Sequence, residues 1–199
     1  MRVFSLFPSP LVEFKISNNL NQLNKEVEKQ TFEETSDFGS ESSKSFNVLS
    51  QCRNIENIIL NCFYQYAQES LKLDTKFKIS TSWYTKIKKG CSCQYHHHKN
   101  CFYSGVLYFG HYKREDDGYL CFLTPLDKLS DYFIKPVKEN LLNTGISLIP
   151  PENGKLIFFP SYLSHRVGQY NGDNPRYSLA FNIVPVGKYG EGDSSMEIR

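Results

Sequence analysis

The sequence predicts a mainly β fold, a sandwich or jelly roll, with one or two helices near the N-terminus. From position 77 onward, short apolar runs alternate with turn residues and no helical period intervenes. Aromatic residues make up 15% of the chain, which suits a β-rich core. A length of 199 residues predicts a single domain over 1–199, with its β core at about 77–186.

The N-terminal part of the chain predicts one edge strand and one long helix. Residues 2–15 read as a strand that Pro8-Ser9-Pro10 interrupts, and proline in a strand indicates an edge position. The polar, acidic segment 26–45 is expected to form a surface loop or to be poorly ordered. Between Arg53 and Leu73, apolar side chains recur at steps of three and four, which predicts an amphipathic helix on the outside of a sheet.

Short strands account for most of the remaining chain, with turn residues such as Gly118 and Gly145 between them. The predicted strands lie at 77–88, 102–109, 119–123, 146–149, 155–159, 165–169 and 176–184. The glycine-containing tail 187–199 is expected to fray at its end. Segments 126–143 and 26–45 are candidate lids over a site at one end of the sheets.

Charge and hydropathy exclude several classes of partner. The formal net charge of +2 is too small to indicate binding to nucleic acid or to an anionic membrane. The chain has no apolar run near the ~20 residues of a membrane span and no secretory signal. We therefore expect a cytoplasmic protein whose six cysteines are free thiols.

Three consecutive histidines stand just ahead of the strand predicted at 102–109. Alternate side chains of an extended chain share a face, so His96 and His98 point together while His97 points away. Two imidazoles on one face are half a metal site, or else part of a polar rim. His165 begins another strand, which an antiparallel double sheet can bring opposite the pair.

The strand that starts at Arg176 has one apolar and one polar face. Its polar face carries the guanidinium of Arg176, the hydroxyl of Ser178 and the amide of Asn182. A buried polar face needs a polar ligand, and the planar fork of arginine matches a carboxylate, to which Ser178 can add a hydrogen bond. The alternative for Arg176 is an ion pair at the rim of the sheet.

A zinc site is a competing interpretation of the same region. Cys91 and Cys93 precede the histidines, and thiolate and imidazole are the ligands that zinc prefers. The cysteine spacing, however, is not one of the common structural-zinc patterns. This interpretation also leaves His165 and Arg176 without a role.

A series of short motifs extends over nearly the whole chain. They are Leu6-Phe-Pro-Ser-Pro10, Ser82-Trp83, Gly90, His96-x-His98-x-Asn100, Ser104-Gly-Val-x-Tyr108, Gly154-Lys-Leu-Ile-Phe-Phe-Pro160, His165-x-Val167, Arg176-x-Ser178 and Phe181-Asn182. No single motif is specific, but in their order and spacing they resemble a family of 2-oxoglutarate- and Fe(II)-dependent oxygenases found in marine bacteria and their phages.

The resemblance implies a double-stranded β-helix, the cupin-like jelly roll, with iron at one end of the barrel. His96 and His165 match the first and last iron-binding histidines of the family. Arg176 matches the arginine that holds the far carboxylate of 2-oxoglutarate, and Ser178 matches its hydroxyl partner. Tyr108, on a neighbouring strand, is a second candidate partner of the same carboxylate.

The sequence departs from the pattern of the wider superfamily at position 98. Most members have Asp or Glu there, whereas His98 is a neutral nitrogen ligand. The predicted metal set is therefore His96, His98 and His165, with one negative charge fewer and weaker retention of Fe(II). The alternative is that His98 does not bind the metal but supports the residues that do. Water or another side chain would then complete the metal site. We also expect Asn182, which shares the polar strand face with Arg176, to bind the co-substrate.

The implied activity is hydroxylation of an unidentified small molecule or peptide, with Fe(II), 2-oxoglutarate and O2, and with release of succinate and CO2. One alternative is a three-histidine, cupin-type thiol dioxygenase in which Arg176 binds the carboxylate of a substrate amino acid. The other is a non-catalytic metal- or sugar-binding jelly roll. The oligomeric state is open, with a homodimer among the options, and a phage protein would act in the host cytoplasm.

Overall fold

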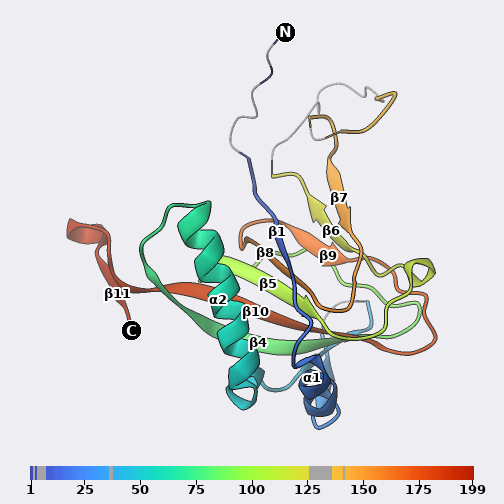
Figure 1. Cartoon of the computed structure of the whole chain (residues 1–199). Helices are drawn as coiled ribbons and strands as arrows, with labels where there is room; N and C mark the ends of the chain where they lie inside the picture. The colour runs from blue at the N-terminus through green and yellow to red at the C-terminus, as the bar shows by residue number, and fades with distance from the viewer. Residues whose placement is uncertain (2, 4–7, 36–37, 126–135, 141) are drawn as a thin grey trace.

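The computed structural model describes residues 1, 3, 8–35, 38–125, 136–140 and 142–199 (Figure 1). Its helices and strands are β1 (Val12–Lys15), α1 (Leu20–Val27), β2 (Phe32–Glu34), β3 (Ser40–Ser43), α2 (Arg53–Glu69), β4 (Lys76–Ile87), β5 (Tyr103–Tyr108), β6 (Leu120–Leu123), β7 (Ile146–Ile149), β8 (Lys155–Pro160), β9 (His165–Val167), β10 (Arg176–Tyr189) and β11 (Met196–Ile198). Short 3₁₀ turns lie between some of them.

Two antiparallel sheets form the fold, which confirms the predicted jelly roll. The larger sheet has the strand order β1-β8-β5-β10-β4-β3-β2, and β11 adds to β10. The smaller sheet has the order β7-β6-β9. The strands predicted from position 77 onward all form, and β1 lies at an edge as its prolines indicated.

Both helices cover one face of the larger sheet, and α2 runs across its middle strands (Figure 1). The ring of Phe63 in α2 lies 5.0 Å from that of Phe77 and 5.3 Å from that of Phe158. Leu23 of α1 joins the same cluster. The amphipathic helix is therefore confirmed. No helix in the described part of the chain is long and apolar enough to cross a membrane.

The larger sheet separates two apolar layers because successive side chains of a strand point to opposite faces. On β8, Leu156 and Phe158 pack under the helices, whereas Ile157 and Phe159 pack with Phe122 of the smaller sheet. The helices thus close one face of the larger sheet. The space between the two sheets is left to form the interior of the barrel.

The expectation of a surface loop over 26–45 is wrong. β2 and β3 extend the larger sheet beyond β4, and the Glu41 carboxylate lies 2.7 Å from the ammonium of Lys86. The Ser43 hydroxyl accepts a hydrogen bond from the backbone N–H of Tyr84. Polar composition misled the prediction because backbone pairing and buried polar contacts stabilise these strands without an apolar pattern.

The tail 187–199 is also more ordered than its composition predicted. β10 continues to Tyr189, and β11 folds back so that Gly187 lies opposite Ile198. The two halves of the tail satisfy each other's backbone groups, and this pairing leaves no periodic signal in so short a stretch. Of the candidate lid at 126–143, residues 126–135 and 141 lie outside the described part of the structure.

Candidate functional site

Three histidines meet between the two sheets. The chain at His96 runs antiparallel to the start of β9, and His96 and His165 exchange two backbone hydrogen bonds of 2.9 and 2.8 Å. The backbone N–H of His98 donates to the carbonyl of Ser161 at 3.0 Å. Each of the three side chains offers a ligand atom, and these atoms all lie within 4.8 Å of one another. That spacing suits one metal ion.

Backbone carbonyls orient two of the three rings. The Nδ1 atom of His96 lies 2.9 Å from the carbonyl oxygen of Gln94, and that of His165 lies 2.9 Å from the carbonyl oxygen of Leu163. Because a carbonyl oxygen only accepts, each Nδ1 carries the proton and donates it. The lone pair of each Nε2 is then left for a metal.

The buried histidines are held in the neutral form that binds metals. Burial, reinforced by the neighbouring His96, lowers the pKa of His165 to about 3. The same causes lower the pKa of His98 to about 4. His165 is 5% exposed, whereas His96 lies at the surface. The site is thus buried on one side and open on the other.

These pKa values predict the acid sensitivity of the metal-free protein. Below its ordinary pKa of 6.5, His165 takes up a proton in the unfolded chain, but in the folded chain it does so only near pH 3. The free energy of unfolding should therefore fall as the pH drops from 6.5 towards 3. Urea unfolding across this range, compared with His165→Asn, measures the effect. The slope should be shallower in the variant, and equal slopes would contradict the assignment.

Arg176 is a buried cation in the barrel. The residue is 2% exposed, and none of its three guanidinium nitrogens has a hydrogen-bond partner among the described residues. The Tyr108 hydroxyl is likewise buried without a partner there, and the Arg176 guanidinium carbon lies 5.1 Å from the centre of the Tyr108 ring. A buried cation without a hydrogen-bond partner is costly, so the position of Arg176 favours a ligand that brings a carboxylate.

The loop that closes over Arg176 depends on Gly118, which the sequence marked only as a turn residue. Gly118 has a φ of +68°, and a Cβ there would lie 3.3 Å from Cδ of Arg176 and 3.1 Å from the Tyr170 ring. Glycine permits both the left-handed backbone and the close approach. In the sequence, only the position of this glycine in a polar turn hints at such a requirement.

The other predicted co-substrate residues lie on the same face of β10. Ser178 is buried and pairs across the sheet with Tyr108. The Asn182 amide is engaged within the protein: its oxygen accepts from the Ser104 hydroxyl at 2.8 Å, and its nitrogen donates to the Thr81 hydroxyl at 2.9 Å. Ser178 is therefore closer to Arg176 along the strand, and Asn182 lies in a polar network farther on.

The geometry removes the basis of the zinc interpretation. Within the described residues, the cluster of metal-ligand side chains contains no cysteine, and Cys93 packs with Ile87 and Tyr170 instead. The six cysteines, all in the described part of the chain, form no disulfide. Two loop carboxylates near the later motifs are engaged elsewhere, Asp173 with a lysine 2.6 Å away and Glu152 with another at 2.9 Å.

Two sequence comparisons bear on the family. A family model described as "Putative 2OG-Fe(II) oxygenase" matches residues 81–182, half of the chain, and the match includes the three histidines and Arg176. A comparison with the curated proteins finds no match.

Solved structures share the fold at low sequence identity. An oxidoreductase of the 2OG-Fe(II) oxygenase family from Burkholderia pseudomallei is 13% identical, with a TM-score of 0.61 over 87% of this chain and 84% of that one. HygX from Streptomyces hygroscopicus, solved with nickel, 2-oxoglutarate and hygromycin B, is 10% identical, with a TM-score of 0.61 over 89% and 83%. A prolyl-4-hydroxylase from Pseudomonas putida is 14% identical, with a TM-score of 0.58 over 87% and 92%. These likenesses agree with the jelly roll.

Proposed function

Since the chain belongs to the 2OG-Fe(II) oxygenase family, we propose that it binds Fe(II) through its three clustered histidines and 2-oxoglutarate (2OG) through Arg176. The observation that carries this proposal is the buried guanidinium of Arg176, which has no hydrogen-bond partner among the described residues and lies in the same barrel as the three imidazoles. A dicarboxylate that reaches from the metal to Arg176 would satisfy both sites with one molecule.

The proposed reaction is hydroxylation of a substrate C–H bond. When bound, Fe(II) supplies the redox chemistry by which O2 oxidises 2OG to succinate and CO2, one oxygen atom entering succinate and the other the hydroxylated product. His96, His98 and His165 would donate three nitrogen atoms and leave the remaining coordination positions open. The two ring nitrogens tied to backbone carbonyls keep the ligand geometry rigid.

The task of the remaining residues is to orient the co-substrate and keep water away. Arg176 would hold the far carboxylate of 2OG with two parallel N–H donors, and Ser178 would donate from the same strand. Burial raises the pKa of Tyr108, so its hydroxyl stays protonated and can donate to the same carboxylate. Apolar side chains such as Phe122 and Phe159 line the interior between the sheets. For Asn182 we propose a supporting role at the far end of the strand.

The proposal extends to the whole chain, residues 1–199, as one oxygenase domain with its jelly-roll core at about 77–186. It is supported by the helix-side cluster, to which residues of α1, α2 and four strands of the larger sheet contribute. The substrate would be a small molecule or a peptide. A cytoplasmic location, or the host cytoplasm for a phage protein, stays a prediction, as does a homodimer.

The test is an anaerobic titration of Fe(II)-loaded protein with 2OG. We expect the visible charge-transfer band of a metal-chelated keto acid, followed by slow succinate release when O2 is admitted. Protein shown to hold iron but lacking the band would contradict the proposal. Zn(II)-loaded protein, which should bind 2OG without the band or turnover, is the control.

One observation favours a second candidate, a thiol dioxygenase. Its metal ligands would be three neutral imidazoles, as they are here if His98 is a ligand, and Arg176 would bind the carboxylate of an amino-acid thiol. This activity would consume O2 with a thiol such as cysteine and release no succinate. O2 uptake measured with cysteine and with 2OG in separate runs distinguishes the two, and a binding-only jelly roll would consume O2 in neither.

A further inference from the structure

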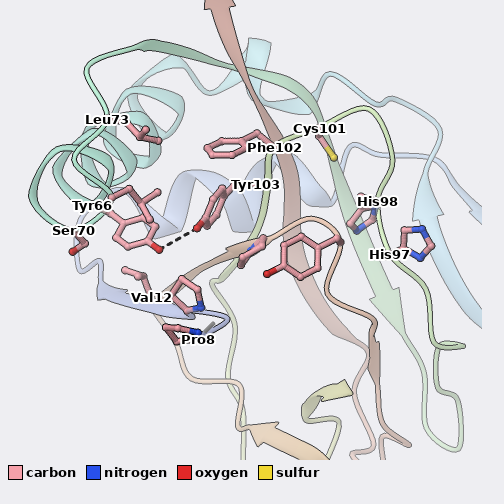
Figure 2. Close-up of a pocket in the computed structure, with 14 residues that line it drawn as sticks. Pro8, Val12, Tyr66, Ser70, Leu73, His97, His98, Cys101, Phe102 and Tyr103 are labelled. Atoms are coloured by element: carbon pink, nitrogen blue, oxygen red, sulfur yellow. Dashed lines mark hydrogen bonds between the residues drawn. The ribbon is translucent and has the colours of Figure 1, made fainter. Parts of the chain in front are cut away.

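A cavity of about 890 Å³ adjoins the candidate metal site. His98 forms part of its wall at one end, and Tyr66 of α2 at the other (Figure 2). Phe102, just before β5, and Tyr103, its first residue, lie between the two ends in the same view. Tyr162, on the loop before β9, also contributes to the wall. The volume falls within the range of about 300–1,000 Å³ that small-molecule sites occupy.

The described wall of this cavity is mostly apolar, with four aromatic rings and no acidic, lysine or arginine side chain. None of the described residues that line it is Asp, Glu, Lys or Arg. Two of its aromatic rings are accessible from solvent, since Phe102 is 40% and Tyr162 59% exposed. A charged ligand here would lose its hydration without gaining a partner, whereas an apolar ring system would gain contact with flat aromatic faces.

The wall also offers a few polar atoms. The hydroxyls of Tyr66 and Tyr103 form a hydrogen bond of 3.1 Å, drawn as a dashed line in Figure 2. The Tyr162 hydroxyl lies 3.3 Å from that of Ser9. Hydroxyl groups both donate and accept, so they can orient a ligand with hydroxyl or carbonyl groups. These hydroxyls would fix the orientation of a ligand in the cavity without favouring a charged one.

We propose that this cavity is the substrate site and that it selects an uncharged small molecule built largely of apolar or aromatic rings. The proposal rests on the oxygenase function proposed above, because it identifies the C–H bond to be hydroxylated as one held near His98. The metal site and the cavity share that side chain as a common wall. Phe102 and Tyr162 are then specificity-determining residues.

Two fluorescent probes with one ring skeleton test the selection against charge. N-phenyl-1-naphthylamine is neutral, and 8-anilino-1-naphthalenesulfonate carries a sulfonate on the same skeleton. The neutral probe should bind with enhanced emission. The sulfonate probe should bind more weakly, by a factor of about ten or greater. Equal affinities, or preference for the sulfonate, would overturn the proposed selectivity.

Variants locate the probe in the cavity. Phe102→Ala and Tyr162→Ala should each weaken binding of the neutral probe about tenfold, because each removes an aromatic face. Both side chains are partly exposed, so the fold should survive, as thermal unfolding can verify. Phe38→Ala is the matched control, since Phe38 is 67% exposed and lies outside the cavity. If only the control variant loses binding, the neutral probe does not bind in this cavity.

Quenching of the probe by a bound metal ion tests this proposal separately from the oxygenase function. Emission of the bound neutral probe should be quenched in Cu(II)-loaded but not in Zn(II)-loaded protein, and His165→Ala should remove the quenching. Probe binding without quenching would place the cavity apart from the metal and overturn the inference. If the 2OG charge-transfer band appears but the probe does not bind, the substrate-site proposal is wrong and the oxygenase function still stands. Quenched probe without that band would refute the oxygenase function and the substrate role built on it.

Discussion

Arg176→Met is expected to weaken 2OG binding by about 100-fold or more while leaving the ligand-free protein at least as stable as the native one. Losing one partner of a desolvated charge pair typically costs about 2–5 kcal/mol of binding. In the ligand-free protein, however, the guanidinium has no partner among the described residues, and methionine fills similar space without a buried charge. Anaerobic titration and thermal unfolding measure the two effects.

A matched control is available in Lys155, a second buried cation at 3% exposed. Its ammonium lies 2.9 Å from the Glu152 carboxylate and donates to the carbonyl of Pro150. Lys155→Met should therefore lower stability and leave 2OG binding unchanged, the opposite of Arg176→Met. If Arg176 were instead a rim ion pair, its variant would lose stability and keep binding. Arg176→Lys, which keeps the charge but loses the fork, should lie between.

His98→Asp is expected to bind Fe(II) about tenfold more tightly than the native protein, and His98→Ala about 100-fold more weakly. The aspartate would add a negative charge beside a dication, whereas alanine removes a ligand atom altogether. Losing residues that merely support metal ligands already costs about 10–100-fold in affinity, so losing a ligand should cost at least as much. Anaerobic competition with a chromogenic chelator measures the affinities.

His111→Ala is the control for this series because His111 is an exposed histidine outside the three-histidine cluster. It should leave the Fe(II) affinity unchanged. If His98→Ala also binds Fe(II) like the native protein, His98 is not a ligand. The 2OG titration of His98→Asp should then show the native band, because the electronic environment of the metal would be unaltered.

Much of the fold follows from local pattern. The period of two along 176–182 separated Arg176 and Ser178 from Leu179 and Phe181, and the structure has these pairs on opposite faces of β10. The steps of three and four at 53–73 likewise marked the buried side of α2. Periodicity is readable from sequence because each residue's direction depends only on its neighbours along the chain.

Pairing of polar strands could not be predicted in the same way. β2, β3 and β11 are held by backbone hydrogen bonds and by contacts such as the ion pair between Glu41 and Lys86, which composition does not reveal. These strands lack the apolar alternation from which a strand is recognised. A polar segment therefore looks the same in sequence whether it is a loop or an edge strand.

The residues that could carry the chemistry are recognisable from residue type and spacing alone: three histidines, and an arginine on a polar strand face. Three features follow from the packing of the chain instead: His165 lies against His96, Arg176 is buried with no hydrogen-bond partner among the described residues, and Tyr66 and Phe102 line a cavity beside His98. The physical reason is that residue type and periodicity are local, whereas burial, desolvation and the meeting of distant side chains depend on how the sheets and helices pack.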